Sequence, residues 1–311
     1  MQGMRSERGQ ATVLFAISAV ALLSMGALSL DAGRAYVLVQ HLKTAADAAA
    51  LAGGQDLPGN PSQAQVDAVA AAQANGLSAS DVTVSVSQGN QVITVTTRGT
   101  VPYYFAPLFG VDAGTFKQTS AAQVGPMSQM QGAVPIGVYQ QSFNYGQTYT
   151  LKAGAGGGSC GNYGALDLTG SSGSSGSSGE GDDGGNNGAS QYQTNLEDGY
   201  SGTLTVGEQV PTKPGNMTGP TEKGLQSRES SDPNSTYQTV LPTSPRVLYL
   251  PIISASDCGK SSVTIVGFAA FYLQSASCDG AVTGQFLNLV VDGQFGSSAG
   301  SYGLQAERLI Q

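Results

Sequence analysis

Few residues of this chain have the types and spacing that catalysis requires. His41 is the only histidine among 311 residues, and it follows an N-terminal apolar run by about 16 Å of helix. A Ser-His-Asp or Cys-His site elsewhere would have to borrow that imidazole. Two acidic pairs, Asp182-Asp183 and Glu197-Asp198, have the chemistry of a glycosidase, but loop-like and turn-like surroundings lack the rigid placement it needs. The sequence therefore predicts no catalytic residue and no enzyme.

The acidic and glycine-rich stretches do not form a ligand-binding motif. The run GEGDDGGNN (179–187) offers carboxylate and amide oxygens for Ca²⁺, without a recognisable ligand spacing, so a solvated loop is the favoured interpretation. The glycines of KAGAGGGSCG (152–161) are not followed by the Lys-Ser or Lys-Thr of a phosphate loop. We expect no metal, no cofactor and no small-molecule substrate.

Three cysteines, Cys160, Cys258 and Cys278, are the disulfide candidates. No CxxC spacing is present, and three pairings are possible. A Cys258–Cys278 bridge would close a loop of about 20 residues and contribute roughly 3 kcal/mol. The odd number leaves one thiol unpaired.

The elements that would position any site begin with a membrane-length apolar segment. Residues 9–30 carry no charge, and the twenty residues 11–30 span about 30 Å as a helix, the thickness of the hydrocarbon core. Arg5 and Arg8 precede this run and Asp31 follows it, which predicts a cytoplasmic tail (1–10) and an extracytoplasmic bulk. A cleaved signal peptide is the alternative, but the run is long and continues in helical register.

Residues 31–125 predict an α+β unit. The membrane helix should continue to Gly53-Gly54, and a second helix, Ser62–Ala74, should follow the Asn60-Pro61 cap with Val66, Val69, Ala70 and Gln73 along one side. Alternating valines at 82–86 and 92–95 predict a hairpin, and 116–124 a third strand. The segment 101–112, VPYYFAPLFGVD, should pack against that hairpin as a loop or short helical turn.

Residues 126–132 read as a linker, and 133–311 as a β-rich, sandwich-like domain. Candidate strands lie at 149–153, 165–168, 202–210, 245–253, 262–275 and 285–291. A Gly/Ser-rich insert at 170–188 should be a flexible loop. The fold class is thus α+β: a transmembrane helix continuing into an α+β unit, followed by the β-rich domain.

Charge is unevenly distributed. Residues 1–125 hold six basic and seven acidic residues, whereas 126–311 hold seven and fourteen. An acidic outer part argues against binding nucleic acid, which relies on cationic contacts to phosphate.

Asp31 and Arg34 are three residues apart at the exit from the membrane and can pair on one helix face. A local ion pair is favoured over contact with a partner helix. Asp47 stands alone among alanines as a solvated or capping charge, with the second helix or a partner as alternatives. Ser29-xxx-Gly33 would allow close helix approach.

The segment from Arg8 to Gly54 closely resembles the N-terminal region of the TadE/TadG-like family of Tad/Flp pilus-assembly proteins. The matching features are Arg8-Gly9, the apolar run, the D-x-G-R-x-Y set from Asp31 to Tyr36, and AADAAALA (45–52). No Glu stands five residues after Gly9, where Leu14 lies, so the resemblance does not extend to a peptidase-processed pilin.

The resemblance implies a single-pass membrane protein that is a non-catalytic structural or accessory component of a Tad-type pilus apparatus. Its partners would be the lipid bilayer and other pilus-assembly or envelope proteins. The candidate partner-contact residues are Asp31, Gly33, Arg34, Tyr36 and Asp47. A surface adhesin or cell-envelope binding protein on the same anchor is the alternative function.

Overall fold

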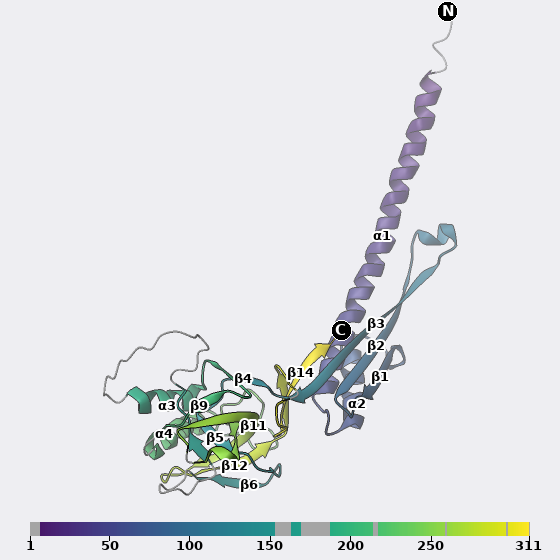
Figure 1. Ribbon diagram of the computed structural model, residues 1–311. Coiled ribbons are helices and arrows are strands. Elements are labelled where there is room, and N and C mark those ends of the chain that lie inside the picture. Colours follow the sequence, from purple (N-terminus) through teal and green to yellow (C-terminus); the bar gives the residue numbers. More distant parts are fainter. Residues whose placement is uncertain are drawn as a thin grey trace, which may run out of the picture. The chain divides into compact units, whose positions relative to one another are not determined.

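Figure 1 presents the computed structural model of the chain, which describes residues 7–152, 163–168, 187–213, 217–258, 260–296 and 298–310. The chain divides into two compact units. The first unit comprises Met1–Ala122 with Leu309–Gln311, and the second comprises Gln123–Arg308. The α+β class with a β-rich second part is confirmed.

The first unit is organised on α1 (Glu7–Gly54), a single helix of 48 residues. Its length is about 72 Å, which confirms that the apolar run continues into the folded part. From Ala11 onward the helix is long and apolar enough to cross a membrane, with a best-window mean hydropathy of 2.3 and no residue of that window buried against protein. Ser18, Ser24 and Ser29 donate to carbonyls four residues back, which pairs their hydroxyls inside the apolar run.

The C-terminal half of α1 packs through alanine. Ala45, Ala46, Ala49 and Ala50 are fully buried and permit close approach of α2 (Pro61–Ala74), whose first turn is capped by the Asn60 side chain. The buried face of α2 consists of Ala64, Ala68 and Ala72, so the predicted face through Val66 is wrong. Alanine side chains form the α1–α2 contact because their small size lets the two helix backbones approach closely. Val66 is left exposed.

Three strands complete the first unit: β1 (Val82–Ser87), β2 (Val92–Pro102) and β3 (Ala113–Pro126), along which the chain enters the second unit. The 3₁₀ turn η1 (Ala79–Asp81) precedes β1, which pairs antiparallel with β2 as predicted. Hydroxyl pairs Thr96–Thr119 and Thr100–Thr115, at 3.0 and 2.9 Å, join β2 to β3. The connection between them holds η2 (Ala106–Phe109), the predicted short helical turn. We call residues Tyr104–Val111 the hairpin tip; Figure 1 shows it alongside α1.

The second unit is built on a mostly antiparallel sheet in the order β6-β12-β11-β10-β5-β7, with β9 also pairing with β11. Within the described part of this sheet, β5 and β10 pair in parallel. Further short pieces are the antiparallel pair β4–β8, the parallel pair β13–β14 and the 3₁₀ turn η3. The bounds are β4 Gln129–Gln131, β5 Ile136–Tyr139, β6 Thr148–Leu151, β7 Tyr163–Ala165, β8 Thr203–Thr205, β9 Gln209–Pro211, β10 Val247–Ile253, η3 Ala255–Asp257, β11 Ser262–Ala276, β12 Val282–Leu287, β13 Leu289–Asp292 and β14 Leu304–Ile310.

Two helices that the sequence analysis did not predict pack on this sheet: α3 (Asn187–Asp198) and α4 (Thr218–Ser231). Leu196 of α3 and Leu225 of α4 share one buried cluster with strand residues such as Leu250. Arg228 of α4 donates to Leu196 O and Pro245 O, which links both helices to the start of β10. Helices, rather than a second sheet alone, therefore cover part of the β-rich unit.

The predicted linker and the cysteine pairing can also be compared with the structure. Residues 126–132, predicted as a linker, contain β4 and the buried Met127. Cys278 is a free, exposed thiol, so of the three possible pairings the structure excludes the two that use Cys278. Cys160 and nearly all of the predicted flexible insert 170–188 lie outside the described residues; its last residues begin α3.

Candidate membrane-proximal site

Asp31 lies on the first turn of α1 beyond the apolar run, and its carboxylate binds the hairpin tip. Backbone N–H groups of Tyr104, Phe105 and Ala106 donate to it at 2.8, 2.9 and 2.8 Å. The side chain is only 3% exposed. These three donors open the turn that leads into η2, where N–H groups have no partner within the turn. The carboxylate therefore fixes the tip to the helix at one height.

Arg34 contacts the same loop one turn further along α1. Its Nη1 donates to Pro102 O at 2.7 Å, and its guanidinium carbon lies 4.0 Å from the centre of the Tyr104 ring. This is a hydrogen bond combined with a cation–π contact. The sequence favoured an ion pair between Asp31 and Arg34, but both side chains are instead engaged with the loop, about 70 residues away in sequence.

Gly33 and Tyr36 are exposed on α1. An added Cβ at Gly33 would meet no atom within 4 Å, and Tyr36 is 65% exposed. Their predicted contact with a partner is not tested by the fold, but both positions are accessible to one.

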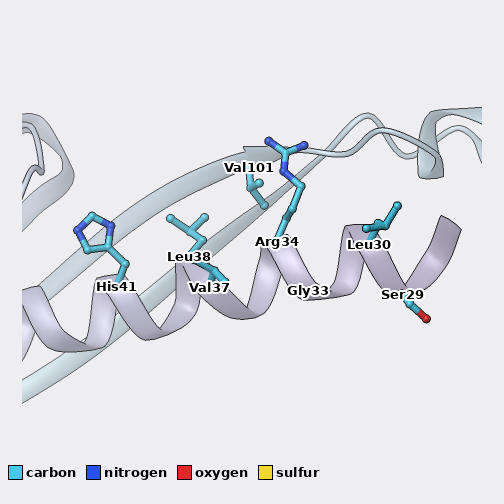
Figure 2. Close-up of a pocket in the computed structure, with 8 residues that line it drawn as sticks. All are labelled: Ser29, Leu30, Gly33, Arg34, Val37, Leu38, His41 and Val101. Carbon is cyan, nitrogen blue, oxygen red and sulfur yellow. The ribbon is translucent and has the colours of Figure 1, made fainter. Parts of the chain in front are cut away.

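An open groove of about 620 Å³ runs along this face of α1 (Figure 2). All but one of its lining residues come from α1, and Val101 comes from β2; the lining set is Ser29, Leu30, Gly33, Arg34, Val37, Leu38, His41 and Val101. Spacings of four place Ser29, Gly33, Val37 and His41 on successive turns of one stripe. The lining is predominantly apolar and includes the small residues that permit close helix approach.

His41 and Asp47 have structural contacts further along α1. His41 Nε2 lies 2.7 Å from Asn75 O at the end of α2. Asp47 lies 2.9 Å from Lys43 Nζ and accepts a hydrogen bond from Ser120 Oγ of β3. Asp47 therefore ties α1 to β3, a contact that the sequence did not indicate.

The hairpin tip was the part of this site that sequence reasoning misplaced. It does form a helical turn, but its large side chains do not pack back on the hairpin. Leu108 and Phe109 are each 82% exposed, Tyr104 is 69% exposed, and Phe105 and Val111 are also exposed. The available signal was the combination of aromatic residues and prolines in VPYYFAPLFGVD.

The described residues contain no group of three or more His, Cys, Asp or Glu side chains that could hold a metal ion. Glu197 lies in the last turn of α3, where Gln193 Nε2 donates to it at 2.8 Å. Asp182-Asp183 and most of the two stretches 152–161 and 179–187 fall outside the described part of the chain.

Residues 9–56 match the TadE/G-like family of Flp pilus-assembly proteins. The match covers α1 from its first turns and the two residues after it, and it supports a pilus-related role. No curated protein matches the chain, and no solved structure does.

Proposed function

We propose that this chain is a membrane-anchored, non-catalytic accessory component of a Tad-type (Flp) pilus-assembly apparatus. The observation that carries the proposal is α1 itself. Over residues 11–30 this continuous helix has an apolar surface that no protein buries. Over residues 42–54 it packs against the rest of the first unit. The segment that matches the pilus-assembly family, residues 9–56, covers both parts.

The proposed orientation places residues 1–10 in the cytoplasm and both folded units outside. Arg5 and Arg8 flank the apolar run on its N-terminal side, and positive flanks favour the cytoplasm. Beyond the other end, acidic Asp31 comes before the first basic residue, Arg34, which is engaged with Pro102 and Tyr104. Protease treatment of intact cells tests this: a C-terminal tag should be removed, whereas an N-terminal tag should be protected.

The groove on α1 is the proposed contact for another membrane-anchored pilus-assembly protein. The mostly apolar lining of the groove begins within the membrane segment, at Ser29 and Leu30, and continues beyond it. A second apolar helix lying along α1 would therefore follow the groove across both regions. A photocrosslinking amino acid at Val37, in the groove, should capture a protein of the apparatus. The matched control is Ala32, which is exposed on α1 but does not line the groove.

Genetic deletion tests the function as a whole. In a bacterium that encodes the chain and assembles such pili, an in-frame deletion should lower the number of surface pili counted by electron microscopy. Full-length protein should restore them, and a variant whose residues 11–30 are replaced by a cleavable signal segment should not. Unchanged pilus numbers in the deletion strain would refute the proposal.

A second candidate function, a cell-envelope binding protein on the same anchor, is favoured by one observation in the second unit. A hollow of about 460 Å³ is lined by amide, hydroxyl and aromatic side chains, among them Gln140, Gln141, Tyr145 and Tyr302. Such a lining suits a polar ligand with flat faces. Co-sedimentation of the full chain in detergent with purified cell-wall sacculi tests it, and Tyr145→Ala should abolish any binding that uses the hollow.

A further inference from the structure

The hairpin tip exposes an apolar surface that no part of the first unit covers. Leu108 and Phe109 are among the most exposed large apolar side chains of the described chain, and Tyr104, Phe105 and Val111 adjoin them. No charged residue occurs between Val101 and Val111. Contiguous apolar surface of this kind marks an interaction site rather than ordinary protein surface.

The height of this surface relative to α1 is fixed. Asp31 is the first residue after the apolar run, and its carboxylate holds the N–H groups of Tyr104, Phe105 and Ala106. Arg34, one turn away from the run, stacks on Tyr104. If α1 crosses a bilayer through residues 11–30, the tip lies at the level where hydrocarbon gives way to headgroups. Tyr and other aromatic residues are enriched at that level.

Most backbone N–H groups of the hairpin tip have hydrogen-bond acceptors within the protein. Besides the three N–H groups bound by Asp31, those of Leu108, Gly110 and Val111 donate to carbonyls within the tip at 3.0–3.2 Å. Pro107 has no N–H to satisfy. Each paired N–H group lowers the cost of moving this backbone from water toward the membrane interface.

We propose that the hairpin tip inserts into the interfacial region of the outer leaflet, as a second membrane contact beside α1. The inference rests on the proposed membrane anchorage. Lipid, rather than a protein partner, is the occupant because the tip continues the apolar surface of α1 at the boundary of its span. Two contacts would restrain rotation and tilt of the first unit on the membrane, which a single helix does not do.

The chain contains no tryptophan, so a single introduced Trp reports on its own position. Phe109→Trp is placed in the full chain, which is reconstituted into nanodiscs of phosphatidylcholine whose acyl chains carry bromine near the headgroup. Bromine quenches Trp on contact. We expect about half or more of the fluorescence to be lost relative to unbrominated lipid, with emission shifted to the blue, because interfacial segments lie about 5–10 Å into the headgroup boundary.

Two further single-Trp variants separate the possible failures. Val66→Trp lies on the exposed face of α2 in the same unit and should not be quenched. Leu22→Trp lies at the middle of the apolar run. If α1 is the anchor, it should be quenched in parallel nanodiscs whose lipid carries bromine near the ends of the acyl chains. Quenching at position 22 without quenching at position 109 would overturn this inference while leaving the anchor intact. Absence of quenching at both positions would overturn the anchor as well.

A protein occupant gives a different result. A photocrosslinking residue at Leu108 that captures a protein in the cell envelope, together with a Phe109→Trp signal that brominated lipid does not reduce, would overturn the lipid assignment. Removing the Asp31 carboxylate, which holds the hairpin tip on α1, tests the lipid contact independently. Asp31→Ala combined with Phe109→Trp should reduce Trp quenching at position 109, whereas Asp31→Ala combined with Leu22→Trp should leave Trp quenching at position 22 unchanged.

Discussion

Gly53 and Gly33 both lie on α1, but only Gly53 faces protein. A Cβ added at Gly53 would lie 2.4 Å from Ile93 Cδ1 and 2.6 Å from the Ala64 carbonyl oxygen. The Ile93 methyl can rotate away, whereas the Ala64 oxygen belongs to the backbone of α2. Gly53→Ala therefore forces α2 away from α1.

The magnitude follows from two opposed effects. Overpacking of this kind costs about 1–3 kcal/mol. Replacing a helical glycine with alanine returns up to about 1 kcal/mol of helix propensity, less in a last turn such as that of Gly53. The net expectation is a destabilisation of roughly 1–2 kcal/mol, which is about a 5- to 30-fold increase in the open population.

Hydrogen–deuterium exchange of the full chain in detergent measures this effect where it should occur. Amides of α2 should exchange about 5- to 30-fold faster in the Gly53→Ala variant. Peptides of the second unit, such as those of β10 and β11, should keep their wild-type rates and serve as an internal control. Their invariance would show that the change is local to the first unit.

Gly33→Ala is the matched control on the same helix. No atom lies within 4 Å of its added Cβ, so only the gain in helix propensity remains, and exchange of α2 should be unchanged. Wild-type exchange of α2 in Gly53→Ala would refute the packing argument. Equal acceleration by both variants would refute it too, because it would show that glycine matters here for backbone freedom and not for space.

Three further predictions concern pH, a buried hydroxyl and the cysteines. Burial and the neighbouring Asp67 carboxyl raise the pKa of Asp56 to about 6, so its native state binds a proton more tightly than the unfolded chain. The contribution of Asp56 to the stability of the first unit should therefore be complete below about pH 4 and be lost as pH rises through 6, and urea midpoints of Asp56→Asn should lack this contribution. Thr97 donates to Leu42 O at 3.0 Å from a fully buried position; Thr97→Val should cost about 1–2 kcal/mol in urea unfolding, and a neutral result would contradict the hydrogen bond's role. Maleimide should label one cysteine, Cys278, before reduction and three after it, whereas three labels without reductant would exclude a disulfide.

Several elements of the first unit were predictable from local sequence. An uncharged run of membrane length followed by alanines has one stable conformation, a helix, and Gly53-Gly54 ends it. The Asn60-Pro61 cap and the valine alternation of β1 and β2 were equally readable, as were the long strands β10 and β11 of the second unit, because propensity and period act over a few residues.

Contacts between distant segments were not predictable in this way. Nothing in the order Asp31-x-Gly33-Arg34 indicates that its two charges bind a loop about 70 residues later, since pairing within the helix was locally available. The α2 face was misread for a related reason: hydrophobicity pointed to Val66, but close packing of two helices selected Ala64, Ala68 and Ala72. The sequences of α3 and α4 are short and polar, so burial of residues such as Leu196 and Leu225 with the sheet stabilises them as helices.

By itself, then, the sequence determined that a membrane-length helix leads into an α+β unit and a β-rich second part, because hydrophobic run length and residue period depend only on neighbouring residues. The tertiary structure alone decided that Asp31 and Arg34 hold the hairpin tip beside the end of the apolar run, and that the aromatic side chains of the tip face outward. That arrangement depends on the closure of the long β2–β3 hairpin against α1, which places three backbone donors around one carboxylate.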